Sequence, residues 1–202
     1  MASIVLHERA ALHGLAMPGH YGREGVTGLV IEERSDLAFA TVIAKREKRF
    51  ALINAVNTTF GVVLPDRARR VSRGAVTFAG VGPEQWLASI EGAEALGFAA
   101  RVRSRVGLFA AVSDQSDSRL VLRLSGARVR DVLAKGIPLD LHPKVFEVND
   151  VACTFLAHMS VQLDMLDDAP TYQLIAPRSM AGSLWSWLTA SAAEFGYDVV
   201  SR

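Results

Sequence analysis

The chain of 202 residues has one cysteine, a net charge of only +1 and no long apolar run. A single cysteine, Cys153, excludes an internal disulfide. The longest apolar stretches fall short of the ~20 residues that a membrane-spanning helix needs. The nearly balanced charge gives no reason to expect nucleic acid or an acidic membrane as a partner. The N-terminus has no basic segment followed by an apolar one, as a signal peptide would. These absences predict a soluble, cytoplasmic protein.

Several motifs that mark enzymes are also missing from the sequence. It contains no GxGxxG that opens a helix, no GxxxxGK[ST] and no GxSxG, so it predicts no dinucleotide fingerprint, phosphate loop or serine elbow. The glycines of Gly80-Val-Gly82-Pro83 join two expected strands and indicate a β-turn. Cys153 stands in the apolar run VACTFLAHM, which favours a buried, unreactive thiol.

The histidines and carboxylates form no recognisable site. No histidine has a His or Cys partner three or four residues away on an expected helix, so no zinc pattern is present. His158 falls in an apolar strand and is expected in the core. Three acidic groups stand in or beside polar turns and are expected to be solvated, which is unsuited to acid-base chemistry. The histidines are His7, His13, His20, His142 and His158, and the acidic groups are Glu32-Glu33, Asp114 with Asp117, and Asp164 with Asp167-Asp168. The sequence therefore predicts no catalytic, cofactor-binding or metal-binding residue in this chain.

The composition is that of a globular protein, with 50% hydrophobic and 21% charged residues. A strand, a short helix and a stop follow one another between Val112 and Pro143. Apolar residues alternate at 120, 122 and 124 and then recur at 129, 132 and 133, so the period changes from two to about 3.6. Gly136 suits a left-handed residue just past the helix, and Pro138 cannot continue it.

The same reasoning gives the remaining elements. Strands are expected at 27–32, 37–44, 75–81, 85–90, 152–159, 161–165, 171–176 and 197–200, and helices at 47–60, 92–106 and 179–194. The first two strands should pair in one sheet, and the last should be an edge strand. Phe50, Ile53, Val56 and Phe60 should share the buried face of the first helix. Arg67 to Arg73 reads as a basic loop that is solvated or faces a partner.

The order of elements repeats. Ser35-Asp36 and Ser116-Asp117, 81 positions apart, both precede a strand, a helix, a loop, further strands and a longer helix. The sequence thus predicts an α+β fold with two similar subdomains, 26–109 and 110–202, packed as one structural unit after an N-terminal arm, 1–25. Trp185 and Trp187 point to different faces of the last helix, so one can serve the core and the other an interface.

Several stretches resemble the gamma subunit of heterotetrameric bacterial sarcosine oxidase. They are SDSRLVLRLSGARVRDVLAKGIPLDLHP at 116–143, TFLAH at 154–158, YQLIAPRSMAGSLWSWL at 172–188 and EFG at 194–196, and more weakly VVLP at 62–65 and GPEQWLASI at 82–90. The resemblance implies a fold related to the folate-binding domain of the glycine-cleavage aminomethyltransferase.

The resemblance further implies a non-catalytic structural subunit that assembles with alpha, beta and delta subunits. That complex converts sarcosine, oxygen and tetrahydrofolate to glycine, hydrogen peroxide and 5,10-methylenetetrahydrofolate, with FAD, FMN, NAD and zinc carried by the partner subunits. The isolated chain is then expected to be inactive and free of cofactors.

Two alternatives remain open. The chain could be a stand-alone folate-binding, one-carbon or tRNA-modification-linked protein of the same fold. Against this, the motif K-G-C-x-x-G-Q-E of those relatives is missing, since Lys135-Gly136 is followed by Ile137. The other alternative is an unrelated α+β interaction module.

Overall fold

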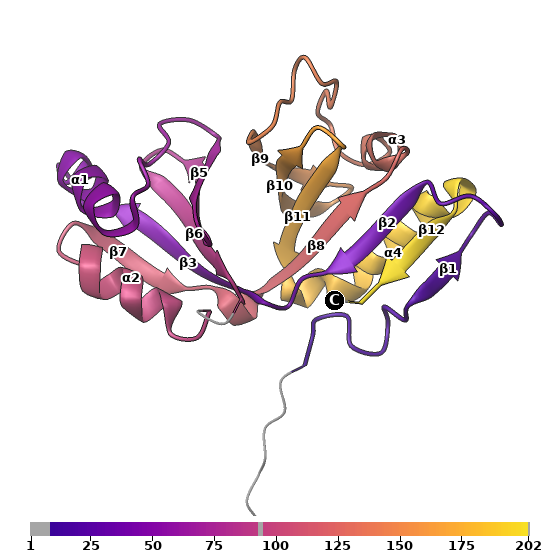
Figure 1. Cartoon of the computed structure of the whole chain (residues 1–202), viewed down its shortest axis with the longest axis horizontal. Coiled ribbons are helices and arrows are strands. Elements are labelled where there is room, and N and C mark those ends of the chain that lie inside the picture. Colours follow the sequence, from indigo (N-terminus) through magenta and orange to yellow (C-terminus); the bar gives the residue numbers. More distant parts are fainter. Residues whose placement is uncertain (1–8, 93–94, 202) are drawn as a thin grey trace, which may run out of the picture.

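The computed structural model describes residues 9–92 and 95–201, and these form two β-sheets that splay apart from a shared vertex (Figure 1). The seven-stranded large sheet has the order β1 (Gly19–Tyr21), β12 (Tyr197–Val200), β2 (Leu29–Glu33), β8 (Arg119–Ser125), β11 (Thr171–Pro177), β10 (Met159–Asp167) and β9 (Val151–Leu156). The five-stranded small sheet has the order β4 (Arg70–Arg73), β5 (Val76–Gly82), β6 (Gln85–Glu91), β3 (Leu37–Ala44) and β7 (Ala110–Asp114).

Helices cover the outer side of each sheet (Figure 1). Helices α1 (Arg49–Phe60) and α2 (Phe98–Val106) pack with the small sheet in one hydrophobic core. Helices α3 (Val129–Ala134) and α4 (Ala181–Ala192) pack with the large sheet in another. None of the helices in the described ranges is long and apolar enough to cross a membrane. The mixed α+β architecture that the sequence predicts is therefore confirmed.

The inner faces of the two sheets meet through a small third cluster. Phe39, Leu87, Val121 and Ile175, one from each of β3, β6, β8 and β11, are buried together. Around this cluster the inner faces are polar, with Thr77 and Ser89 on the small sheet and Gln162, Asp164 and Gln173 on the large one. Because side chains alternate along a strand, one face serves a helix-covered core and the other faces the opposite sheet.

Two further connections hold the sheets together. At the vertex the chain passes from β2 to β3, and the backbone N–H of Arg34 donates to the carbonyl of Val121 at 2.9 Å. At the far edges, residues next to β4 and β9 pair directly. Arg69 and Asp150 form an antiparallel bridge, the N–H of Arg70 donates to Asn149, and the N–H of Val151 donates to Ala68. The space between the sheets is thus bounded on two sides.

The repeated order of elements has a counterpart in the sheets. The strands β4-β5-β6-β3 and β9-β10-β11-β8 follow the same spatial order, and each set has a helix after its first and its last strand in sequence. Two strands stand outside these sets. Strand β2 belongs to the predicted subdomain 26–109 but lies in the large sheet, and β7 belongs to the predicted subdomain 110–202 but lies in the small sheet. A shared origin of the two halves and the division into subdomains stay predictions.

Several strand predictions were wrong because they ignored tertiary pairing. The strands now seen as β2 and β3 were expected in one sheet, but buried Arg34 turns the chain from the large sheet to the small one. The N-terminal arm, 1–25, in which no strand was predicted, contributes β1. Because β1 pairs with β12 and β12 pairs in parallel with β2, β12 is not an edge strand. Strand β7 was not predicted as an element.

Other local predictions also needed correction. Phe50 is 82% exposed, and α1 buries Leu52 and Val56 instead. The expected basic loop ends in a strand, β4. Helix α2 starts at Phe98, and the expected start near Gly92 is followed by residues 93–94, outside the described ranges. Gly136 does not have the left-handed conformation expected past α3, since its φ is not positive.

Candidate functional site

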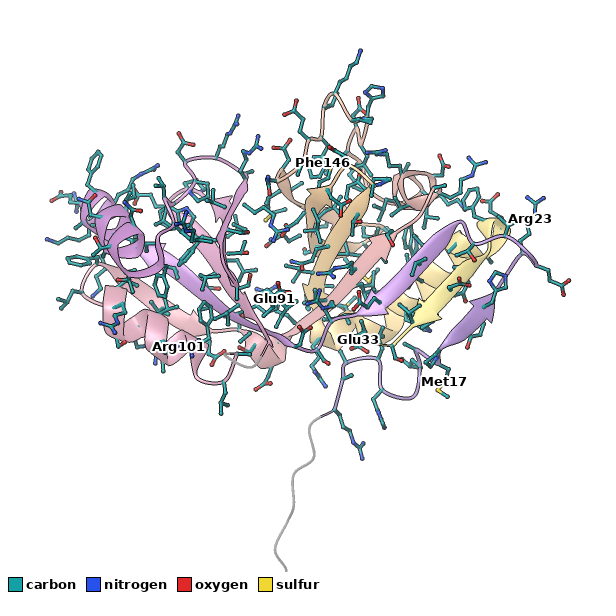
Figure 2. The ribbon with its side chains drawn as sticks, in the orientation of Figure 1. Met17, Arg23, Glu33, Glu91, Arg101 and Phe146 are labelled. Carbon is teal, nitrogen blue, oxygen red and sulfur yellow. The ribbon has the colours of Figure 1, made fainter. Side chains whose placement is uncertain are left out.

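The polar inner faces of the two sheets form the candidate site. Figure 2 shows side chains of both sheets projecting into the space between them, with Glu91 labelled near the vertex. Cross-strand pairing aligns two rows on the large sheet. Arg123, Gln173 and Asp164 form one row. Val121, Ile175, Gln162 and Cys153 form the next. The first row is therefore polar across β8, β11 and β10 and ends at Val151 on β9, while the second combines apolar residues of the inter-sheet cluster with an amide and a thiol.

Asp164 is the most deeply buried acid of this face, with an exposed fraction of 2%. Gln162 Nε2 donates to its Oδ1 at 2.7 Å, and Gln173 Nε2 lies 3.5 Å from its Oδ2. Burial raises the pKa of Asp164 to about 6, although the Gln162 bond, the charge of Arg70 and the Gln173 contact all oppose the rise. The prediction that Asp164 is solvated was wrong, because its side chain lies on the inner face of β10, which is buried towards the small sheet.

Three arginines bring positive charge to the same space. Arg70 comes from β4, and Arg119 and Arg123 come from β8. In each, the Nε atom is buried and has no hydrogen-bond partner. Arg70 acts electrostatically on Asp164, and Nη1 of Arg123 lies 3.8 Å from Glu32. Asp164 and Glu32 thus offset part of the positive charge in this space.

Arg34 anchors the vertex. It is 3% exposed, and its guanidinium donates to both carboxylate oxygens of Asp36 at 2.8 and 2.9 Å and to Glu91 at 2.8 Å. A bidentate arginine pair of this kind fixes geometry as well as contributing energy. Arg34 thus ties the crossing between the sheets to the end of β6. Nothing in the sequence around Arg34 indicated that this arginine would be buried between the two sheets.

The predicted basic loop divides into different roles. Arg69 donates to the carbonyl of Val148 at 2.8 Å and pairs with Asp150 at 3.4 Å, so it joins the two sheets. Arg70 faces the inter-sheet space. Arg67 lines a pocket of about 520 Å³ beside the β5–β6 hairpin, together with Arg49 and Cys153. A solvated or partner-facing role remains a prediction for Arg67 and for Arg73, which is exposed at the end of β4.

The histidines and the thiol are dispersed. His20 Nδ1 lies 2.6 Å from Asp198 on β12, and His142 caps its own turn by accepting from Lys144 N–H. His158 lies in the exposed turn between β9 and β10, not in the core as expected.

Cys153 is exposed, also against expectation, because it is on the inner face of an edge strand. His7 is outside the described residues. Within residues 9–92 and 95–201, no three His, Cys, Asp or Glu side chains are placed to hold a metal ion.

The tryptophans serve the fold. Trp86 is buried and donates from Nε1 to the carbonyl of Pro65 at 2.8 Å. Trp185 and Trp187 are both partly buried against the core of the large sheet. The expected β-turn at Gly82-Pro83 is confirmed as the hairpin between β5 and β6.

Comparison with known proteins identifies relatives along nearly the whole chain. The family model "Sarcosine oxidase, gamma subunit family" matches residues 46–194. The sarcosine oxidase subunit gamma of Corynebacterium sp. (strain P-1) is 34% identical over 186 residues, which is 88% of both chains. The protein of the same description from an Arthrobacter species is 32% identical over 171 residues, or 82% of both chains.

Solved structures agree with these sequence relatives. A chain of the heterotetrameric sarcosine oxidase from Corynebacterium sp. U-96 has a TM-score of 0.79 at 26% identity, covering 93% of this chain and 96% of that one. The glycine cleavage system aminomethyltransferase T from Bartonella henselae has a TM-score of 0.61 at 12% identity, covering 87% of this chain and 48% of that one. The second likeness concerns the fold alone, and agrees with the expected relation to the aminomethyltransferase fold.

Proposed function

Because this chain belongs to the sarcosine oxidase gamma subunit family, we propose that it is the gamma subunit of a heterotetrameric sarcosine oxidase. The observation that carries the proposal is that the structural match extends over nearly the whole length of both chains. The likeness to the heterotetrameric enzyme spans 93% of this chain and 96% of its counterpart, so the two differ by no large domain. A subunit of the same size and fold can occupy the same place in an assembly.

In this proposal the partners are alpha, beta and delta subunits, and the complex is cytoplasmic. It oxidises sarcosine to glycine, reduces oxygen to hydrogen peroxide and transfers the one-carbon unit to tetrahydrofolate as 5,10-methylenetetrahydrofolate. FAD, FMN, NAD and zinc belong to the partners, and this chain contributes structure and no catalytic residue.

The outer end of the small sheet supports a role in assembly. Phe50 at the start of α1 is 82% exposed and Leu108, before β7, is 81% exposed. Lys45 connects the two segments, because its Nζ donates to the carbonyl of Gly107 at 2.7 Å and its own carbonyl accepts from Lys48 N–H. Exposed aromatic and aliphatic side chains that gain energy only on burial are typical of subunit contacts. We name Phe50, Leu108 and Lys45 the end patch.

Substitution in the end patch tests this role. Phe50→Ser combined with Leu108→Ser should reduce the amount of chain that co-purifies with co-expressed alpha, beta and delta subunits. Its unfolding should change little, because exposed positions add little to stability. Phe155→Ser on β9 is the control, since it removes an exposed ring from the other sheet. If the wild type, the double variant and Phe155→Ser were recovered in the complex in equal amounts, the end patch would not be a subunit contact.

A further inference from the structure

A cavity of about 280 Å³ lies between the two sheets, beside the inter-sheet cluster. Its apolar wall includes Leu87 from the small sheet and Ile175 and Pro177 from the large one. Its polar wall includes Arg119, Thr41 and Ser160. The volume is slightly below the range of about 300–1,000 Å³ that is usual for pockets that hold drug-sized molecules. The cavity therefore suits a small molecule with one apolar and one polar end.

Arg119 differs from the other arginines of the inner faces. Arg34 is neutralised by Asp36 and Glu91, and Arg123 faces Glu32 at 3.8 Å. Arg70 offsets the charge of Asp164. In the part of the chain that the structure describes, the side chain of Arg119 has neither a hydrogen bond nor an ion pair, and its Nε is buried. Arg119 as a whole is only partly buried, so the cost is that of one buried N–H donor without a partner, and an anion that pairs with the guanidinium would be stabilising there.

The hydroxyls around Arg119 extend the polar wall. Neither Thr41 nor Ser160 makes a side-chain hydrogen bond to another described residue, and both line the cavity. A guanidinium presents two parallel N–H donors, which match the two oxygens of a carboxylate. One guanidinium with two free hydroxyls fits a single planar anion, and the aliphatic wall fits a short carbon chain or ring attached to it.

We propose that this cavity binds a small carboxylate, with Arg119 donating to the carboxylate and Leu87, Ile175 and Pro177 enclosing the apolar part. The site is made by residues of this chain alone and does not depend on its assembly with other subunits. A carboxylate is favoured over a phosphate because the wall carries one unpaired guanidinium, whereas phosphate sites in proteins draw on several cations or on backbone N–H groups at a helix start.

Cys153 provides a built-in reporter, because it is the only cysteine, is exposed and lines the same cavity. A ligand in the cavity should shield its thiol. The full-length chain is treated with iodoacetamide, and alkylation of the Cys153 peptide is followed by mass spectrometry at increasing benzoate or acetate. The rate should fall with saturation, by about tenfold at ten times the dissociation constant if the bound form does not react.

Arg119→Gln should abolish this protection, while Arg105→Gln on the outer helix α2 makes the same charge change away from the cavity and should leave it intact. No saturable protection in the wild-type chain, or equal protection in Arg119→Gln, would overturn the proposal. Protection that is lost only with Arg119→Gln supports it.

A second measurement covers the case in which Arg119→Gln does not fold. Iodoacetate carries a carboxylate and iodoacetamide does not, so the ratio of their rates at Cys153 should exceed the ratio for free cysteine. Arg119→Lys keeps the charge but loses the paired donors and should lower the ratio. Burial raises the pKa of the Cys153 thiol and Arg119 lowers it by a smaller amount, so a substitution of Arg119 also changes the amount of thiolate. Both reagents react with the same thiolate, and the ratio of their rates is therefore independent of that change. A wild-type ratio equal to that of free cysteine would overturn the proposal.

Discussion

Gly136 lies directly against the indole ring of Trp187, so close that a Cβ atom at position 136 would be 2.4 Å from Cζ2. The glycine is required for contact and not for a left-handed turn, because its φ is not positive. This contact joins the end of α3 to α4. Gly136→Ala should therefore lower the free energy of unfolding by about 1–3 kcal/mol, the usual cost of overpacking. Urea denaturation measures the change.

Gly182 provides the matched control, because a Cβ atom there meets nothing within 4 Å and the residue lies in the first turn of α4. Gly182→Ala should leave stability unchanged or raise it by up to about 1 kcal/mol through helix propensity. If Gly136→Ala behaved like Gly182→Ala, the contact with Trp187 would not be tight in solution.

Arg34 should be a major determinant of how the two sheets are joined. Arg34→Met removes a 3% exposed guanidinium and leaves Asp36 and Glu91 without their shared partner. We expect a loss of about 1–3 kcal/mol, because several charge-assisted hydrogen bonds of a buried guanidinium are lost, although its acidic partners are partly exposed and can be hydrated. Arg46→Met, which removes an exposed pair with Glu47, should cost less than about 0.5 kcal/mol. Thermal and urea unfolding of both variants give the comparison, and similar small losses would contradict it.

Asp164 should make stability depend on pH in an unusual direction. Its pKa is about 6 in the folded chain and 3.8 ordinarily, so between these values the folded state binds more protons than the unfolded state. Its contribution to stability therefore falls by about 3 kcal/mol in total as pH rises from about 4 to about 6. Above pH 6 the contribution stays at this lower level.

Asp164→Asn removes this titration. The free energy of unfolding of Asp164→Asn minus that of the wild type, measured in urea, should increase across the same pH range and level off above it. A difference that is constant between pH 4 and pH 7 would show that the carboxyl of Asp164 is not desolvated.

His20 should control the attachment of β1. Its hydrogen bond to Asp198 and a second to the carbonyl of Arg23 raise the pKa of His20 above 6.5, so the protonated ring is favoured in the folded chain. That contribution is present at pH below 6.5 and is lost as pH rises through the folded pKa. Hydrogen exchange at the amides of 19–21, corrected for intrinsic rates, should therefore be faster at pH 8 than at pH 6. In His20→Asn the corrected rates should be equal at the two pH values, and a persisting difference would assign the effect to another group.

The sequence predicted the elements better than their partners. The alternation at Leu120, Leu122 and Leu124 specifies β8 because one face of the strand is buried under helices. Pairing depends on residues distant in the chain, so nothing near β2 indicated that it would join β8 and β12 while β3 joined the small sheet. The predicted duplication concerned the order of elements along the chain, and it could not indicate that β2 lies in the large sheet and β7 in the small one.

The candidate site was missed for a related reason. Asp164 stands near the turn acids Asp167 and Asp168 in sequence, and although it falls in the expected strand 161–165, nothing local indicated that its face of the strand would be buried. Arg70, Arg119 and Arg123 read as ordinary surface charges, because polar residues alternating with apolar ones normally face water. Here that face is covered by a second sheet. A row of arginine, glutamine and aspartate at alternate positions of three strands was the available signal, and it becomes visible only once the register is known.

The most direct test of the central claim is co-purification. The tagged chain is co-expressed with the neighbouring genes that encode candidate alpha, beta and delta subunits, and the product is examined by size exclusion with absorbance near 450 nm and an assay of sarcosine-dependent peroxide formation. Membership of the heterotetramer predicts that this 21.8 kDa chain elutes with flavin-containing partners at equal stoichiometry. Elution as a free 21.8 kDa protein, while the other subunits form an active complex without it, would contradict the account.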